Sequence, residues 1–209
     1  DAVTLFHEFG HLVHHVLAGQ HPWARFSGVA TEWDFVEAPS QLLEEWAWDA
    51  DVLGSFATNA AGEPIPPELV AKMRAAHDFG KGYQARTQMF YAALSYLVHR
   101  DVPDDLTALM CELQARYDLF AYVPDTHFHA SFGHLEGYGS GYYTYMWSLV
   151  IAKDLFSVFD PADLFDTALS YRYRDRVLAP GGSEDAADLV ENFLDRPYSF
   201  DAFRRWLDT

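Results

Sequence analysis

The stretch VTLFHEFGHLVHHVLAG (residues 3–19) carries more information about the fold than any other part of the chain. Its apolar side chains recur at helical spacing and Gly19 follows the last of them, so we expect one amphipathic helix here. In such a helix His7 and His11 lie one turn apart on one face, about 6 Å along the axis. Two imidazoles so placed can bind one tetrahedral Zn²⁺, and Glu8 projects beside the metal, where it can accept a proton from a zinc-bound water.

A catalytic zinc normally has three protein ligands, so a third must come from elsewhere in the chain. The metzincin class would need glycine at position 14 and histidine at position 17, but these residues are His14 and Leu17. That class is excluded. A glutamate on a following helix is the remaining common solution, and residues 32–46 contain several candidates.

Other polar residues near the predicted site have less defined roles. Asp34, Glu44 and Glu45 are each candidates to orient a ligand imidazole, and their spacing does not choose among them. His14 and His15 lie three and four residues after His11, so either could flank the site, but both are expected to be ordinary helix histidines, either hydrogen-bonded or exposed.

The rest of the chain predicts a mainly α fold with at most a few short strands. Residues 26–29 are expected to form a short strand or extended segment, and residues 120–141, rich in glycine and histidine, are expected to form a loop. Gly80 and Gly82 are expected to interrupt the chain before a helix. After the first helix, we expect helices over residues 34–60, 83–100, 104–118 and 142–159, and one that starts at Pro66. Short helices are expected after Pro161, Gly182 and Pro197.

Composition narrows the classes of partner and compartment. The formal net charge of −17 disfavours nucleic acid and anionic membrane surfaces as partners. Every apolar stretch is broken by a charged residue or histidine within about a dozen residues, too few to span a bilayer. The single cysteine, Cys111, rules out an internal disulfide and fits a reducing compartment, so a cytoplasmic location is expected.

A second constellation of polar residues lies in HLEGYGSGYYTYMW (residues 134–147). Peptide hydrolysis places negative charge on the scissile carbonyl oxygen, and tyrosine and histidine are suitable neutral donors to it. Tyr142 and Tyr145 are three residues apart and can share one helix face, while the glycines permit a loop that closes over a peptide. The alternative is a tyrosine-rich helix start that packs into the core. Upstream, His127 and His129 are expected to be loop histidines without a metal role.

Three motifs together resemble the thimet oligopeptidase family, which includes neurolysin, bacterial oligopeptidases and dipeptidyl carboxypeptidases. These motifs are HEFGH (residues 7–11), FSG (26–28) and DFVEAPSQ (34–41), and residues 134–147 resemble the glycine-rich substrate loop of the family. The resemblance implies a zincin-type, multi-helix catalytic region with one Zn²⁺ per chain. The site residues that it implies are His7, His11 and Glu37 as zinc ligands, Glu8, Tyr145 and His134 as catalytic groups, and Tyr138 and Tyr142 as substrate contacts.

By this resemblance, residues 1–209 would form the C-terminal catalytic region of a peptidase, with zinc helices over 3–60 and a substrate loop over 120–145. Because family members are much longer before the zinc helix, we expect an N-terminal part to be absent and to be a candidate partner of this chain. The implied function is a zinc-dependent metalloendopeptidase that hydrolyses short unfolded peptides.

Two alternatives remain open at the level of sequence. The first is a dipeptidyl carboxypeptidase of the same family, which must recognise a free C-terminal carboxylate. Arg86, Arg172 and Arg174 are present, but the sequence gives no reason to direct any of them to the site. The second is a non-catalytic, zinc-binding helical fragment that needs a partner.

Overall fold

The computed structural model describes residues 1–208 and divides the chain into two compact units. Unit 1 contains residues 1–79 together with those from Ser148 onward, and unit 2 contains Gly80–Trp147. Both units are helical, which confirms the prediction of a mainly α fold. Among the described residues the one β contact outside helices is an isolated antiparallel bridge between Thr58 and Pro64.

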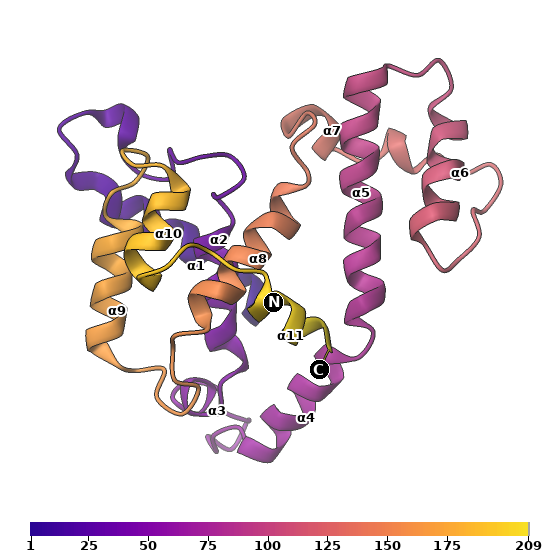
Figure 1. The fold of residues 1–209 in the computed structure, drawn as a ribbon. Coiled ribbons are helices and arrows are strands. Elements are labelled where there is room, and N and C mark those ends of the chain that lie inside the picture. Colours follow the sequence, from indigo (N-terminus) through magenta and orange to yellow (C-terminus); the bar gives the residue numbers. More distant parts are fainter. Residues whose placement is uncertain (209) are drawn as a thin grey trace. The chain divides into compact units, whose positions relative to one another are not determined.

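Unit 1 is built around the N-terminal helix α1 (Ala2–Leu17), which packs against α2 (Ala38–Leu43). Figure 1 shows α1 and α2 crossing beside α8, α9 and α10. The core contains fully buried Phe35, Leu42 and Phe193. The other helical elements of unit 1 are η1 (Ala18–Gln20), η2 (Ala24–Phe26), η3 (Glu44–Trp48), α3 (Ala50–Gly54), α4 (Pro67–Asp78), α9 (Thr167–Tyr173), the π-helical turn η5 (Arg174–Leu178), α10 (Ala186–Leu194) and α11 (Asp201–Asp208).

Unit 2 consists of two packed helices and an aromatic loop region. The long helix α5 (Lys81–Asp101) lies beside α6 (Leu106–Tyr117), as Figure 1 shows. The loop that follows contains η4 (Phe128–Ala130) and α7 (His134–Gly137). Helix α8 (Thr144–Phe156) begins in unit 2 and ends in unit 1. The buried core of unit 2 contains Phe90, Leu94, Met110, Leu113, Phe132 and Tyr142.

The single helix expected over residues 34–60 is wrong. Residues 38–54 instead form α2, η3 and α3, and the break falls at Asp49, whose backbone is extended (φ −95°, ψ 136°). The Asp49 carboxylate accepts hydrogen bonds from the backbone N–H groups of Asp51 and Val52, at 3.0 and 2.9 Å. An aspartate that caps a new helix in this way ends the preceding one, because its own backbone leaves the helical region.

The short strand expected over residues 26–29 is also absent. Residues 24–26 form η2, Ser27 is extended without a strand partner, and Gly28 has a positive φ of 68°. Gly28 must remain glycine, because a Cβ there would lie 2.4 Å from Nδ1 of His15. The loop over 120–141 contains two short helices, and of the two glycines expected to interrupt the chain only Gly80 does so, with φ 77° directly before α5.

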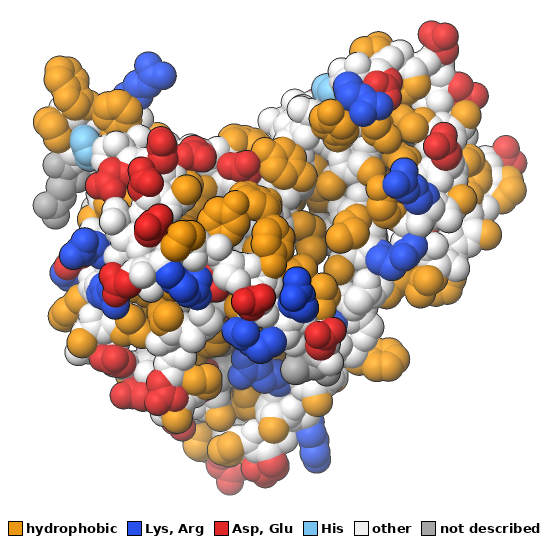
Figure 2. All heavy atoms as spheres, in the orientation of Figure 1, with side chains coloured by type: hydrophobic (Ala, Val, Ile, Leu, Met, Phe, Trp, Pro, Cys, Tyr) orange, Lys and Arg blue, Asp and Glu red, His pale blue; other side chains and the backbone are white. Residues whose placement is uncertain are grey.

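The chain has a formal net charge of −17. Figure 2 shows acidic, basic and apolar side chains interleaved over the visible face. Within residues 1–208 no helix is both long and apolar enough to cross a membrane.

Candidate active site

The predicted metal ligands meet in unit 1, where α1 crosses the start of α2. His7 and His11 project from one face of α1, and Glu37 is the N-cap residue of α2. One ligand atom from each of the three lies within 4.8 Å of the others. Oε2 of Glu37 is 3.2 Å from Nε2 of His7 and 3.1 Å from Nε2 of His11.

These separations fit Zn²⁺. Ligand atoms bound at about 2.0–2.1 Å in a tetrahedral arrangement lie about 3.3 Å from one another, which is close to both carboxylate–imidazole distances. The rings of His7 and His11 are nearly perpendicular, with centroids 5.0 Å apart, so the two nitrogen atoms converge without stacking of the rings. Two imidazoles and a carboxylate are also a common ligand set of catalytic zinc.

The protonation of this cluster shows how strongly its three members interact. Hydrogen bonds to Glu37 and Glu44 raise the pKa of His7 to about 10. Burial of Glu37 opposes its ionisation, but hydrogen bonds from His11 and His7 outweigh burial and hold the pKa of Glu37 well below its usual range. A metal ion that bound here would displace the proton of His7 and use the same lone pairs.

Glu44 is the carboxylate that orients a ligand imidazole. Its Oε1 lies 2.7 Å from Nδ1 of His7, so it fixes the ring with Nε2 toward Glu37. The other two candidates have different partners. Glu45 forms ion pairs with Lys153 and with Arg74. The backbone carbonyl of Asp34, not its carboxylate, accepts a hydrogen bond from Ser148 at 2.8 Å.

Ser40 is a contributor that the sequence predictions missed. Its hydroxyl lies 2.9 Å from the carbonyl oxygen and 3.2 Å from Oε2 of Glu37, and the residue is fully buried. A serine three residues after a helix N-cap carboxylate is the signal that could have identified it, because one turn brings both side chains together.

Glu8 lies between the two ligands on α1 and is exposed. Among residues 1–208 no hydrogen bond or ion pair involves its side chain, so the carboxylate can reach a water molecule beside the metal ligands.

The two histidines that follow the ligands differ from each other. His15 is exposed and its ring covers Gly28. His14 is fully buried, and neither ring nitrogen has a hydrogen-bond partner within the described part of the chain. The expectation that His14 is either hydrogen-bonded or exposed is therefore wrong. Burial lowers the pKa of His14 to about 4, so the ring is neutral near pH 7.

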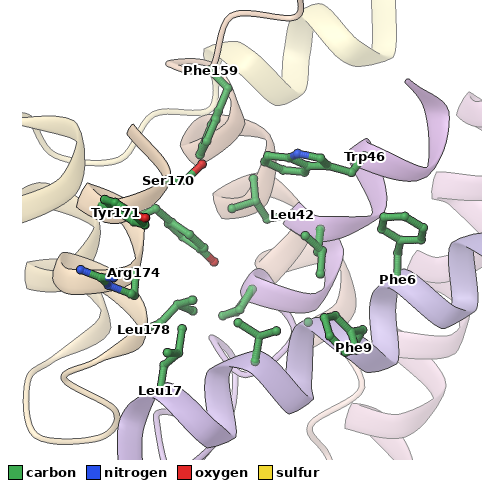
Figure 3. A pocket seen from close by; sticks show the side chains of 15 residues that line it. Phe6, Phe9, Leu17, Leu42, Trp46, Phe159, Ser170, Tyr171, Arg174 and Leu178 are labelled. Atoms are coloured by element: carbon green, nitrogen blue, oxygen red, sulfur yellow. The ribbon is translucent and has the colours of Figure 1, made fainter. Parts of the chain in front are cut away.

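The face of α1 turned away from the ligands lines an apolar pocket of about 370 Å³. Figure 3 shows Phe6 and Phe9 of α1 across the pocket from Tyr171, and Leu17 of α1 next to Leu178. The guanidinium of Arg174, which lies over the Tyr171 ring, is the one charged group in its lining. The pocket lining thus contains none of the carboxylates, such as Glu37 and Glu44, that lie against the ligand-bearing face of α1.

The predicted donors His134, Tyr138 and Tyr145 meet within unit 2. The hydroxyl of Tyr145 donates to the hydroxyl of Tyr138 at 2.7 Å and lies 3.4 Å from Nε2 of His134. The rings of Tyr138 and Tyr145 stack with centroids 5.5 Å apart. All three residues are partly exposed.

Tyr142 is a buried member of the unit 2 core, and its role as a substrate contact stays a prediction. Its hydroxyl donates to Oε1 of Gln88 at 3.1 Å, and burial raises its pKa to about 12. Ser95 lies two turns after Gln88 on the same face of α5. Its hydroxyl donates a hydrogen bond to the carbonyl oxygen of Gly139 at 2.7 Å. These contacts favour the alternative in which Tyr142 packs into the core. Tyr142 in turn helps to position Tyr145, which lies one turn later on α8. The sequence did not point to Gln88 or Ser95.

His127 and His129 contact each other in the loop of unit 2, with ring centroids 5.8 Å apart. Among the described residues, the one group of three or more histidine, cysteine or acidic side chains with convergent ligand atoms is His7, His11 and Glu37. The expectation that the two loop histidines have no metal role stays a prediction.

Comparison with known proteins places this arrangement in a family. A family model described as peptidase family M3 matches residues 1–209. Oligopeptidase A of Escherichia coli is 35% identical over 97% of this chain and 31% of its own length. A thimet-like oligopeptidase of Dictyostelium discoideum is 34% identical over 93% of this chain and 30% of its own length. Mitochondrial intermediate peptidase of Mus musculus is 33% identical over 96% of this chain and 28% of its own length.

The chain therefore spans about a third or less of the length of these relatives. The match nevertheless includes both the metal-ligand cluster of unit 1 and the tyrosine cluster of unit 2. By this family match and by its identity to these relatives, the chain belongs to peptidase family M3.

Proposed function

We propose that this chain carries the catalytic groups of a zinc-dependent metalloendopeptidase that hydrolyses short, unfolded oligopeptides. The observation that carries the proposal is the convergence of His7, His11 and Glu37, with Glu8 exposed between the two histidines. Three protein ligands leave a fourth tetrahedral position open, which is characteristic of catalytic rather than structural zinc.

The residues would divide the chemistry as follows. His7, His11 and Glu37 would hold one Zn²⁺, and Glu44 would keep the His7 ring in the ligating tautomer and orientation. When bound, Zn²⁺ acts as a Lewis acid that polarises the scissile carbonyl and lowers the pKa of water to near 7. Glu8 would accept a proton from the attacking water and then deliver it to the leaving amine.

The tyrosine cluster would supply donors to the carbonyl oxygen as negative charge develops there. Tyr145 would be the principal donor: its hydroxyl lies 2.7 Å from that of Tyr138 and 3.4 Å from Nε2 of His134, and when Tyr138 donates to Tyr145, the Tyr145 proton can turn to the carbonyl oxygen. One such donor is typically worth about 10²–10³ in rate. Tyr138 and His134 would contact the peptide beside it.

We favour an endopeptidase over a dipeptidyl carboxypeptidase because Arg86, Arg172 and Arg174, the arginines considered for binding a terminal carboxylate, have other partners. Arg86 donates to the carbonyl oxygens of Arg116 and Tyr117, each at 2.8 Å. Arg172 pairs with Asp195 at 2.6 Å, and Arg174 pairs with Asp175 at 2.7 Å. A cytoplasmic location stays a prediction from the single cysteine.

The proposal is tested by measuring zinc content and cleavage of a quenched fluorogenic decapeptide by the wild type and by Glu8→Gln. We expect the variant to retain zinc and lose at least about 10²-fold in cleavage rate, because the amide cannot accept a proton. Glu68→Gln, which changes an exposed glutamate in the first turn of α4, is the matched control and should cleave like the wild type.

Absence of zinc from the wild type would overturn the metal assignment. Bound zinc without cleavage by the wild type would favour the non-catalytic fragment. Equal cleavage by the wild type and Glu8→Gln would remove Glu8 from the mechanism. Product mapping on the same decapeptide separates internal cleavage from release of C-terminal dipeptides.

A further inference from the structure

Unit 1 contains a pocket that the proposed mechanism does not use. It lies on the face of α1 turned away from the metal ligands and has a volume of about 370 Å³. Small-molecule sites in proteins usually measure about 300–1,000 Å³, so this pocket is large enough for a molecule with one or two rings. Its aromatic lining residues are Phe6, Phe9, Trp46, Phe159, Tyr171 and Tyr173.

Contacts within unit 1 fix the aromatic rings that border this pocket. The Trp46 ring meets the Phe159 ring edge-on with centroids 5.2 Å apart, and its Nε1–H donates to the carbonyl oxygen of Leu164 at 3.1 Å. Figure 3 shows Trp46 and Phe159 at the upper end of the pocket. The Tyr173 ring meets the fully buried Phe193 ring at 5.5 Å. Rings held in this way present faces and edges that suit an aromatic or bulky aliphatic ligand.

One polar atom of this apolar lining has no partner. The hydroxyl oxygen of Tyr173 is buried, and no group within residues 1–208 forms a hydrogen bond with it. Burial raises the pKa of this hydroxyl above its usual range, so the group keeps its proton at neutral pH and can donate it. A buried hydroxyl without a partner is costly to stability and uncommon in native proteins. A ligand that carries a hydrogen-bond acceptor would supply the missing partner.

Two other polar groups of the lining already have partners. The Ser170 hydroxyl donates to the carbonyl oxygen of Asp166 at 2.7 Å. The Arg174 guanidinium donates to both carboxylate oxygens of Asp175, at 2.7 and 3.0 Å, and lies over the Tyr171 ring. The charge of Arg174 is therefore balanced by its own neighbour, and the lining contains no carboxylate. An ionised ligand would lose its hydration here without gaining an opposite charge.

We propose that this pocket binds a neutral, mainly apolar small molecule whose carbonyl oxygen accepts a hydrogen bond from the Tyr173 hydroxyl. The aromatic walls select an apolar body, the unpartnered hydroxyl selects one acceptor, and the pairing of Arg174 with Asp175 disfavours an acid. The metal ligands take no part in the lining, so the site is separate from the metal cluster. It also does not depend on the proposed peptidase function.

Benzophenone and diphenylmethane are matched probes for this site, because both carry two phenyl rings and only benzophenone has a carbonyl group. Tyr173→Phe removes the hydroxyl and keeps the ring. This variant should be at least as stable as the wild type, because it deletes a buried group without a partner. Tyr171→Phe is the matched control, since it removes a hydroxyl from the same lining but from an exposed residue.

Leucine methyl NMR signals give both the place of binding and the dissociation constant Kd. Benzophenone should shift the methyl signals of Leu42 and Leu178, which line the pocket, and leave those of Leu94 and Leu113 in unit 2 unchanged. Shifts confined to leucines outside the pocket, or no shift at all, would overturn the site.

The hydrogen bond is tested by the ratio of Kd for diphenylmethane to Kd for benzophenone. Comparing this ratio between variants cancels the difference in hydrophobicity between the probes. We expect the ratio to fall about fivefold in Tyr173→Phe, the size of one net hydrogen bond, and to be unchanged in Tyr171→Phe. An equal ratio in the wild type and Tyr173→Phe would mean that the hydroxyl binds only an ordered water, and would overturn the proposal.

The charge of the ligand is tested with para-benzoylbenzoate, which adds a carboxylate to benzophenone. It should bind at least about tenfold more weakly than benzophenone, because Arg174 is already paired. Binding as tight as that of benzophenone, or tighter, would overturn the assignment to neutral ligands.

Discussion

At the scale of single residues, the metal cluster depends on side chains that constrain one another. Oε2 of Glu37 faces both ligand imidazoles, Glu44 contacts the other ring nitrogen of His7, and Ser40 contacts Oε2 of Glu37 itself. His7 therefore has one nitrogen directed to the metal position and the other fixed by a neighbour, whereas Ser40 fixes the ligating oxygen of Glu37. Such secondary contacts typically change metal affinity about 10–100-fold when they are removed.

His14 is the residue whose burial has the clearest consequence for stability. Its folded pKa of about 4 is below the usual histidine pKa of 6.5, so the folded state favours the neutral ring. The unfolded chain therefore binds the proton first as pH falls. The stabilisation is complete above pH 6.5 and is lost toward pH 4, by about 3 kcal/mol in total. His14→Leu should abolish this dependence, and it removes two ring nitrogens buried without partners.

The measurement is urea unfolding of the wild type and His14→Leu at several pH values from 7.5 to 4.5. Every other titrating group is common to both proteins, so the difference between the two curves reports His14. We expect the variant to be equal or more stable at pH 7.5 and to gain about 2–3 kcal/mol on the wild type by pH 4.5. Parallel curves would show that the ring does not resist protonation.

These residues also show what the sequence could predict. The one-turn spacing of His7 and His11 follows from the helix alone, since both positions lie in one element. The choice of Glu44 over Asp34 and Glu45 did not follow, because it depends on where α2 begins and on how α1 crosses it. The burial of His14 was missed for the same reason: helical periodicity places a residue on a face but does not say what covers that face.

At the scale of elements, the close crossing of α1 and α2 positions the third ligand. A Cβ on Gly10 would lie 2.6 Å from Cα of Ser40 and 3.1 Å from the carbonyl oxygen of Pro39. Both contacts are backbone atoms of α2, so Gly10→Ala must push the helix that carries Glu37 away from α1. We expect a loss of about 1–3 kcal/mol in the free energy of unfolding, together with weaker zinc binding.

Urea unfolding and competition for zinc with a chelating dye measure the two effects of Gly10→Ala. Gly54→Ala in α3 is the matched control, because a Cβ there meets no heavy atom within 4 Å. It should bind zinc like the wild type and be unchanged or slightly more stable. If Gly10→Ala retained both wild-type stability and wild-type zinc affinity, the tight crossing would not be needed to hold the site.

Element boundaries were predicted well where the signal was local and poorly where it was not. The helices α5, α6 and α8 lie close to their predicted ranges because periodic apolar residues and clear breakers frame them. The range 34–60 has continuous helix-forming residues. The helix nevertheless ends before Asp49, because the Asp49 side chain caps the next helix instead of continuing the first. The capping preference of aspartate was visible in the sequence, yet its use depends on the packing of α3.

At the scale of the whole molecule, the proposed catalytic groups divide between the two units. The metal ligands, Glu8 and Glu44 belong to unit 1, and the tyrosine cluster belongs to unit 2. The sequence indicated both groups, since each carries a local motif. It could not indicate the division into units, because that depends on contacts between residues far apart in the chain.

The division predicts where bound zinc stabilises the molecule. All three ligands lie within residues 7–37, so zinc ties α1 to the start of α2 and has no ligand in unit 2. At a free zinc concentration of 1,000 times Kd, binding adds about 4 kcal/mol to the state that holds the ligands together. Hydrogen exchange with and without a chelator should therefore show the largest gain in protection at the amides of α1 and α2, and little at those of α5 and α6. In His7→Ala the gain should disappear while exchange in α5 is unchanged. An equal gain across α1 and α5 in the wild type would mean that the two units unfold together, and that zinc stabilises the chain as one cooperative body.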